Sequence, residues 1–483
     1  MEHQKERKKV IILFSILAIA LCIVFNLIEH TMESAEIIPV NPLFIAPFIL
    51  LILGIAVMPF INRHWWEKNY PLVAFLLGLI VVLYYVASLH NVPRLLGTAY
   101  EYISFISLIG SLFIVSGGIH IRMRGKSTPF GNVAILATGA VLSNFLGTTG
   151  ASMLLIRPYL RMNKYRIKPY HIVFFIFIVS NIGGALTPIG DPPLFLGYIK
   201  GIPFFWIISR VFNVWFITVS ILLLIFLFMD LRNFHKEKAS IQKEAAELDE
   251  PEVSGLHNIF FLIMILGAVF IKPPAPLLLR EIIMWIAALG SYYTTKKEIH
   301  EKNDFNFLPI REVAILFAGI FATMIPALDW LELNAGKIGI ITPAHFFWAT
   351  GILSSVLDNA PTYLNFLTAA FGLHGATVDN IHHLQCMLGL STPEALGLPN
   401  PLAANALLIT AKSWKYVQAV SVGAVFFGAC TYIGNGPNFM VKSIAEQAHV
   451  QCPSFFGYIF KYTLPILIPV FILDWYLLFV LGL

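Results

Sequence analysis

Long runs of apolar residues constrain this chain more than any other feature. A helix needs roughly 20 such residues to cross the hydrocarbon core of a membrane. Only 12% of the residues are charged, against about 25% in soluble domains, which argues against a soluble enzyme or a nucleic-acid-binding protein. We therefore expect an all-α polytopic membrane protein with about eleven transmembrane helices. The expected spans are 10–28, 43–60, 72–89, 102–120, 169–199, 204–229, 256–272, 276–294, 312–328, 416–441 and 456–483.

The positions of the basic residues predict the orientation, because Lys and Arg favour cytoplasmic loops. With residues 1–9 inside, the predicted cytoplasmic segments hold 23 of the 32 Lys and Arg residues. This count requires the apolar stretch 130–156 to enter and leave on one side, since basic clusters flank it at both ends. We therefore predict a re-entrant hairpin at 130–156, an N-terminus inside and a C-terminus outside.

The chain also carries an internal repeat. Gly184-Ala-Leu-Thr-Pro-Ile-Gly-Asp-Pro-Pro-Leu-Phe195 recurs as Gly428-Ala-Cys-Thr-Tyr-Ile-Gly-Asn-Gly-Pro-Asn-Phe439, with seven of twelve positions identical. Each copy follows a hairpin-like stretch. The predicted organisation is an anchor helix with an acidic outer loop (1–42), a first repeat (43–229) with hairpin 130–156 and broken helix 169–199, a charged cytoplasmic linker (230–255), and a second repeat (256–483) with hairpin 343–371 and broken helix 416–441.

Glycine and proline in the two broken helices predict the chemistry of the site. These residues interrupt helical hydrogen bonding, so that carbonyls and amides become free at membrane depth. Freed carbonyls can bind cations, whereas half-helix N-termini attract anions. An odd number of crossings separates the hairpins, so the repeats are inverted and the second hairpin enters from outside. Close helix packing alone is the alternative reason for such residues. The predicted break residues are Gly190, Pro192, Gly434 and Pro437.

Two acidic residues fall inside these motifs, where charge is costly and usually functional. Asp191 follows the first Gly190 break, and Asp358 lies at the tip of the second hairpin. We predict that both lie near the membrane midplane and bind Na⁺ or H⁺ in competition. The alternative is that each only caps the helix that follows it. Arg210 and Asp474 are further charges within spans, and their role stays open.

Neutral polar residues around the same motifs complete the predicted site. Asn359, Asn435, Thr187 and Thr431 are the expected supporting ligands of a Na⁺ ion in the Asp191/Asp358 region. Each could instead satisfy the backbone of a nearby helix, which is the usual role of a membrane Ser or Thr. The further candidates are Ser143, Asn144, Thr148, Asn181, Ser354, Ser355 and Thr362.

The segments Ser180-Asn-Ile-Gly-Gly-Ala-Leu-Thr-Pro-Ile-Gly-Asp-Pro-Pro193 and Ser355-Val-Leu-Asp-Asn-Ala-Pro-Thr362 resemble those of the ion transporter superfamily. That group includes NhaD-type sodium/proton antiporters, arsenite pumps and citrate/dicarboxylate transporters. The resemblance implies a scaffold part used for homodimerisation and a transport part of two opposed hairpins and two broken helices. Asp358-Asn359 matches the antiporter pattern at the second tip, whereas Gly147-Thr148 departs from it at the first.

These patterns predict a secondary transporter that works by alternating access. Our first hypothesis is a sodium (or lithium)/proton antiporter of a bacterial-type inner membrane, and the alternative is a sodium- or proton-coupled citrate/dicarboxylate transporter. We expect no enzymatic activity, no cofactor other than Na⁺ as a transported or coupling ion, and no nucleic-acid partner. The expected partners are the lipid bilayer, small ions or a carboxylate, and a second copy of the chain.

Overall fold

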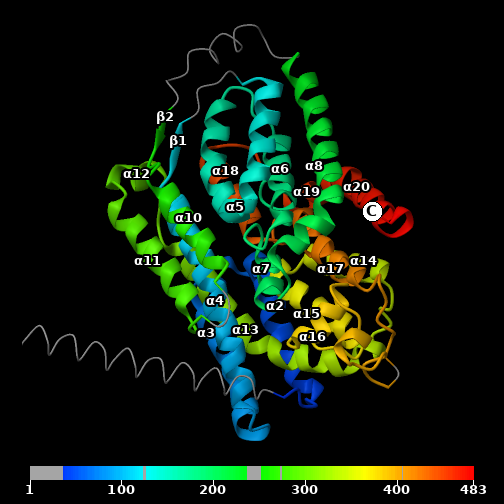
Figure 1. Ribbon diagram of the computed structural model, residues 1–483. Coiled ribbons are helices and arrows are strands. Elements are labelled where there is room, and N and C mark those ends of the chain that lie inside the picture. Colours follow the sequence, from blue (N-terminus) through cyan, green and yellow to red (C-terminus); the bar gives the residue numbers. More distant parts are fainter. Residues whose placement is uncertain (1–35, 123–126, 236–251, 272–274, 405, 483) are drawn as a thin grey trace, which may run out of the picture.

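Helices make up nearly all of the regular structure in the computed structural model, which describes residues 36–122, 127–235, 252–271, 275–404 and 406–482 (Figure 1). Within these ranges the only strands are β1 (His120–Arg122) and β2 (Glu252–Ser254), which pair antiparallel. The all-α polytopic fold class predicted from the sequence is confirmed. The predicted anchor run 10–28 and most of the linker 230–255 lie outside the described residues.

One group of helices packs at the side of the molecule, and we call it the peripheral unit (Figure 1). Many of its large apolar side chains, such as Phe75 and Leu83, are exposed, as expected of helices that face lipid. Asn62 and Asn91 cap the starts of two of these helices. The unit consists of η1 (Pro42–Ile45), α2 (Ala46–Ile61), α3 (Arg63–Leu83), η2 (Tyr84–Ser88), α4 (Val92–Gly117), α10 (Asn258–Val269), α11 (Leu279–Thr294), α12 (Lys297–Lys302), α13 (Leu308–Asn334) and η4 (Ala335–Lys337).

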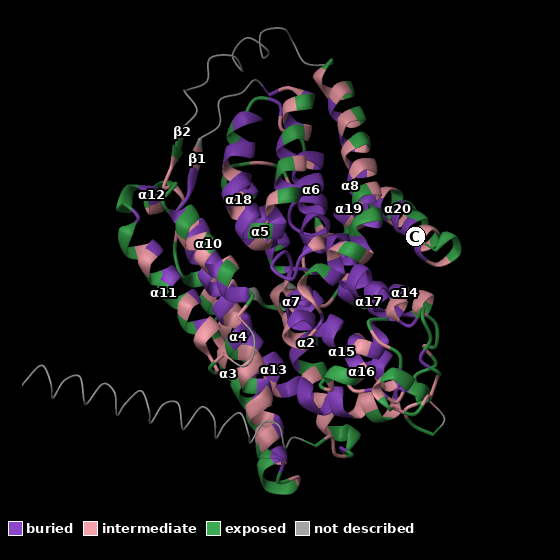
Figure 2. Ribbon diagram, in the orientation of Figure 1, coloured by how far each residue is buried: buried purple, intermediate pink, exposed green. Residues whose placement is uncertain are grey.

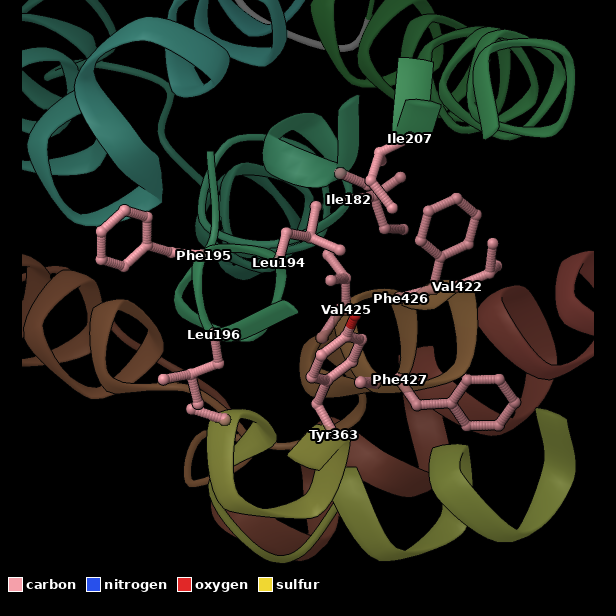
Figure 3. Packing of buried hydrophobic residues seen from close by; sticks show 14 of the residues in the cluster. Ile182, Leu194, Phe195, Leu196, Ile207, Tyr363, Val422, Val425, Phe426 and Phe427 are labelled. Carbon is pink, nitrogen blue, oxygen red and sulfur yellow. The ribbon is translucent and has the colours of Figure 1, made fainter. Parts of the chain in front are cut away.

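The remaining helices form the central unit, whose middle is the most completely buried part of the molecule (Figure 2). Ile182, Leu194, Val425 and Phe426 come together there from both repeats (Figure 3). The unit consists of α5 (Pro129–Met162), α6 (Pro169–Ile178), η3 (Ile182–Leu186), α7 (Pro192–Ile199), α8 (Phe204–Phe234), α14 (Pro343–Ser354), α15 (Asn359–Gly372), α16 (Ile381–Met387), η5 (Glu394–Leu396), α17 (Trp414–Phe427), η6 (Gly428–Cys430), α18 (Gly436–Gln447), α19 (Phe455–Tyr458), η7 (Ile459–Leu467), α20 (Ile468–Trp475) and η8 (Tyr476–Leu481).

Eight helices in the described ranges are long and apolar enough to cross a membrane, fewer than the eleven expected. The difference has physical causes. The run 10–28 is not described, α10 and α11 are short, and the run 416–441 is broken between α17 and α18. In the other direction, α5 has the length and composition of a span although the sequence predicts a hairpin there.

α5 is folded back on itself at Gly147. A straight helix of its 34 residues would be about 50 Å long. The Asn132 and Asn163 side chains nevertheless exchange hydrogen bonds of 2.8 and 2.9 Å, so the two ends of α5 meet. Gly147 has φ 73° and ψ 156°, a conformation that is essentially restricted to glycine. The two arms of this first hairpin are therefore 129–146 and 148–162.

The second hairpin consists of α14 and α15, which pack together and are joined by residues 355–358. The Thr342 side chain caps the start of α14, and Asp358 caps the start of α15. The Tyr416 hydroxyl donates to the Ile341 carbonyl at the hairpin base. The two hairpins thus approach the centre from opposite ends of the molecule (Figure 1).

Two ionic networks lie at the two hairpin bases. At the first, Asp230 of α8 accepts hydrogen bonds from Arg166, Tyr170 and Asn132. This network lies within the central unit and among segments predicted to be cytoplasmic.

The second network joins segments that are all predicted to lie outside. Arg94 of α4 contacts Asp379 at 2.9 Å, and Lys200 contacts both Asp379 and Glu101 at 2.6 Å. Arg94 also pairs with Asp329 of α13 at 2.8 Å. Because Arg94 and Glu101 belong to α4 and Lys200 follows α7, this network ties the central unit to the peripheral unit.

Candidate functional site

Four half-helices begin at one place in the core of the central unit. The second arm of α5 begins at Thr148, α7 at Pro192, α15 at Asn359 and α18 at Gly436. The first two come from the first repeat and the other two from the second. The site is therefore built by the two hairpin tips and the two helix breaks together.

Glycines make the breaks sterically feasible. A Cβ atom on Gly190 would lie 2.0 Å from the Gly184 carbonyl oxygen, and one on Gly434 would lie 2.6 Å from the Gly428 carbonyl oxygen. In each break the backbone thus approaches itself closely at a pair of glycines. A residue with a side chain at position 190 or 434 would require a backbone shift. Prolines in the first turns of α7 and α18 then restart the helix, because proline suits that position.

Asp191 lies at the meeting point and is fully buried. The Thr148 hydroxyl donates to its Oδ1 atom at 2.8 Å, and the Asn359 amide donates to its Oδ2 atom at 2.6 Å. The Asn435 amide donates to Oδ1 at 3.1 Å. Both hairpin tips and the second helix break therefore bind one carboxyl group of the first break.

The structure separates the two interpretations of the acidic residues. Asp191 occupies the N-cap position of α7, but its side chain makes no capping hydrogen bond. The Asp358 side chain does cap its helix, because its Oδ1 atom accepts a hydrogen bond from the Ala360 amide at 3.1 Å. It is Asn359, the next residue, that contacts the Asp191 carboxyl. Capping therefore accounts for the orientation of Asp358 and does not account for that of Asp191.

Several other candidate ligands point to backbone groups and not to the central carboxyl. Thr187 donates to the Asn144 carbonyl at 2.7 Å, and Thr431 donates to the Ser355 carbonyl at 2.6 Å. These two bonds hold each break against its own hairpin tip in the same way. The remaining bonds to backbone carbonyls are those of Ser143 to Val179, Asn144 to Gly183, Ser354 to Ala424, Ser355 to Ile352 and Thr362 to Asp358.

Asn181 lies one contact away from the central carboxyl. Its Oδ1 atom accepts a hydrogen bond from Asn435 at 3.2 Å, and its amide donates to Asn438 at 2.7 Å. Asn438 was not among the predicted site residues, although it donates to two carbonyls of the second break. The repeat contained a signal for it, because Asn438 stands where the first copy has the apolar Leu194.

Hydrogen-bond donors and helix N-termini surround the Asp191 carboxyl. Each helix N-terminus carries a partial positive charge, and four of them gather here. The three side-chain groups that contact the carboxyl are placed as hydrogen-bond donors to it: one hydroxyl and two amides. Within this arrangement the unpaired oxygen atom is Oδ1 of Asn359. As placed, these donors are occupied by the Asp191 carboxyl itself.

A small cavity lies beside the first hairpin tip, between it and α4. It is lined by Leu108, Leu112, Gly147, Thr148 and Pro192 among others, and its volume is about 30 Å³. That space holds roughly two water molecules, while pockets for small molecules measure roughly 300 to 1,000 Å³. As the structure places these residues, the cavity is too small for a small-molecule ligand.

A family model described as "Putative citrate transport" matches residues 38–479, which is nearly the whole chain. No curated protein matches the sequence. The match covers both hairpins, both broken helices and the peripheral unit.

Proposed function

We propose that this chain, which belongs to the citrate transport family, carries citrate or a chemically similar carboxylate. Membership of that family and the apolar helices make it a multi-pass membrane protein and a secondary transporter. The observation that carries the choice of an anion is the meeting of four helix N-termini at a cluster of amide and hydroxyl donors. Half-helix N-termini recognise the anionic groups of transported substrates.

Asp191 supplies the coupling in this proposal. A substrate carboxylate that approached the same donors would bring a second negative charge beside Asp191, which is fully buried. Two like charges in a dry site repel strongly. Uptake of a proton by Asp191 removes one of them, so substrate and proton enter together. The proposed reaction is therefore proton-coupled symport of the carboxylate.

Alternating access follows from the two opposed hairpins. The first hairpin has its base among predicted cytoplasmic segments and the second among predicted outer segments. The Arg94–Asp379 and Lys200–Glu101 pairs hold the outer side of the central unit against α4. We propose that these contacts break when the site opens outward, and that the peripheral unit forms a homodimer in a bacterial-type inner membrane.

Sodium/proton antiport is the second candidate function. Two observations favour it: Asp358 directly precedes Asn359, which contacts Asp191, and Asn359 Oδ1 has no hydrogen-bond partner. An amide that turned this oxygen toward the centre would offer a cation ligand.

Reconstituted vesicles separate the two functions. We expect labelled citrate to accumulate when the side facing the outer network is made acidic, and a pH-sensitive dye to report proton entry with it. Asp191→Asn should abolish both signals. Proton movement that requires Na⁺ or Li⁺ and ignores citrate would overturn the citrate proposal and support antiport. Arsenite, tested in parallel, covers the third substrate class of the superfamily.

A further inference from the structure

A file of buried polar side chains, each with one N or O atom that lacks a hydrogen-bond partner, runs from Asn359, beside Asp191, toward the predicted outer side. Twelve buried side-chain N and O atoms in the described residues have no hydrogen-bond partner. Five of them lie on the facing sides of α8, α15 and α17: Asn359 Oδ1, Tyr363 Oη, Ser421 Oγ, Gln418 Oε1 and Arg210 Nε. Buried polar groups are usually satisfied by protein or by ordered water, so such a concentration needs an explanation.

The inner end of the file is on α15. Asn359 contacts Asp191 directly, and Tyr363 is one helical turn further along the same face. Side chains four residues apart in a helix lie on the same face, about 5–6 Å apart at their Cβ atoms. The Tyr363 ring lies in the apolar core near Leu194 and Val425 (Figure 3). Its hydroxyl is the polar group at that depth.

Gly197 of α7 makes room for this hydroxyl. A Cβ atom at position 197 would lie 2.3 Å from Tyr363 Oη. The absence of a side chain there lets the phenol reach the boundary between α7, α15 and α17. On the other side, α15 packs against α17, which carries Ser421.

The outer end of the file is on α17 and α8. Gln418 is three residues from Ser421 on the same face of α17, and its amide donates to the Arg210 carbonyl. The Arg210 guanidinium stacks on the Trp414 ring at 4.1 Å, at the start of α17. Arg210 is partly exposed, whereas Gln418 and Ser421 are buried. The file thus connects the partly exposed rim near Trp414 with the buried centre.

We infer that this file holds water molecules that carry protons between the outer side and Asp191. A proton that arrives at the rim forms an O–H bond with the next water or hydroxyl, which releases its own proton inward, and the last transfer forms the O–H bond on the Asp191 carboxyl. Tyr363 and Ser421 are positioning residues, because they act on Asp191 through water. The charged and titratable groups along the route are Asp191, Tyr363 and Arg210, with Asp358 near its inner end and Lys415 beside Trp414 at its outer end. This inference rests on the proton coupling proposed above.

Protonation of Asp191 itself provides a test that does not depend on the substrate. In right-side-out vesicles, protons released from a caged acid on the outer side should produce an infrared carboxylic-acid band that Asp191→Asn removes. We expect the combined variant Tyr363→Phe and Ser421→Ala to slow the rise of this band by roughly 100-fold. Tyr416→Phe is the matched control, because its hydroxyl bonds the Ile341 carbonyl away from the file, and it should keep the original rate.

Two results would overturn the inference: an unchanged rate in the combined variant, or an Asp191 band that responds only to protons released on the inner side. Thermal unfolding of each variant shows whether it is folded, and Ser421→Ala alone is the milder substitute if the combined variant is not. Absence of citrate uptake in the same vesicles would contradict the proposed substrate and leave the infrared result unaffected.

Discussion

The two repeats build the same scaffold and distribute charge in opposite ways. Thr187 and Thr431 make equivalent bonds to their hairpins, and Gly190 and Gly434 make equivalent backbone crossings. The first repeat has its acid in the helix break, at Asp191, and a neutral tip. The second has its acid at the tip, at Asp358, and a neutral break. The two repeats therefore share the geometry of their breaks and differ in where the acid lies.

The hairpin bases differ in a second way. Arg166 and Asp230 connect the first base only to other parts of the central unit. Asp379, near the second base, pairs with Arg94 of the peripheral unit. On the opposite side the central and peripheral units are linked by the Arg157–Asp304 pair at 3.4 Å, in which Asp304 is largely exposed. The structure is thus tied more firmly at its outer side, where the ion pairs are shorter and more buried.

Exchange of the two break residues is the strongest test of this comparison. Asp191→Asn should reduce citrate uptake by at least about 100-fold, because an amide cannot take up the proton that the proposal couples to the substrate, and a positioned proton-transfer group contributes about 100- to 10,000-fold to a rate. Asn435→Asp in the same chain returns a carboxyl to the equivalent position. We expect citrate to raise the unfolding temperature of this double variant more than that of Asp191→Asn alone. If Asp191→Asn alone transports normally, the acid in the first break has no role in coupling.

The second tip gives the next largest effect. Asn359→Ala removes the 2.6 Å bond to Asp191, and hydrogen bonds to charged groups contribute about 1.5–3 kcal/mol. Asp358→Asn keeps a capping side chain and should lose less than half of the citrate uptake. Citrate uptake rates of the two variants show which of the two residues matters more for transport. A greater loss in Asp358→Asn than in Asn359→Ala would favour the antiport hypothesis, in which Asp358 carries an ion.

The first tip should respond to backbone strain. Gly147→Ala forces an alanine into φ 73° and brings its Cβ atom 3.3 Å from the Ile189 carbonyl, which should destabilise the protein by about 1–3 kcal/mol. The equivalent Asp358 has φ −56°, so Asp358→Ala should lose only its cap, about 1 kcal/mol. Thermal unfolding in detergent measures both. Equal losses would mean that the two tips carry equal strain.

The outer network should give the smallest effect, and it should depend on pH. Burial raises the pKa of Asp379, but Lys200 and Arg94 lower it, so that the net pKa lies below the ordinary carboxyl range. A carboxyl of this kind contributes stability above its unfolded pKa of about 3.9, and that contribution is lost as the pH falls through its folded pKa. Asp379→Asn should therefore lower the unfolding temperature at pH 7. The difference in unfolding temperature between this variant and the original protein should become smaller below about pH 4. Glu67→Gln, in α3, is the control outside this network.

Much of the site was predictable because it depends on local chemistry. The pattern of Gly, Asp and Pro in each break indicates freed backbone groups wherever it occurs, so Asp191 and Asn435 could be chosen from the sequence. The closing of α5 was predictable from charge, because a crossing would have placed one basic cluster outside. The partners of Asp191 were harder to choose. Thr148 and Asn359 belong to different repeats, and only the packing of the two tips brings them to one carboxyl.

The sequence by itself determined a membrane protein of two inverted halves, because hydropathy, basic residues and motif order act along the chain and need no distant contact. The tertiary structure decided which polar groups act at the centre. Thr187 and Thr148 are equally good candidate ligands in the sequence. In the structure Thr187 donates to the Asn144 carbonyl, whereas Thr148 donates to Asp191. It also decided the character of the site. The direction in which four half-helices point, and so the sign of the charge they favour, exists only once both repeats are folded together.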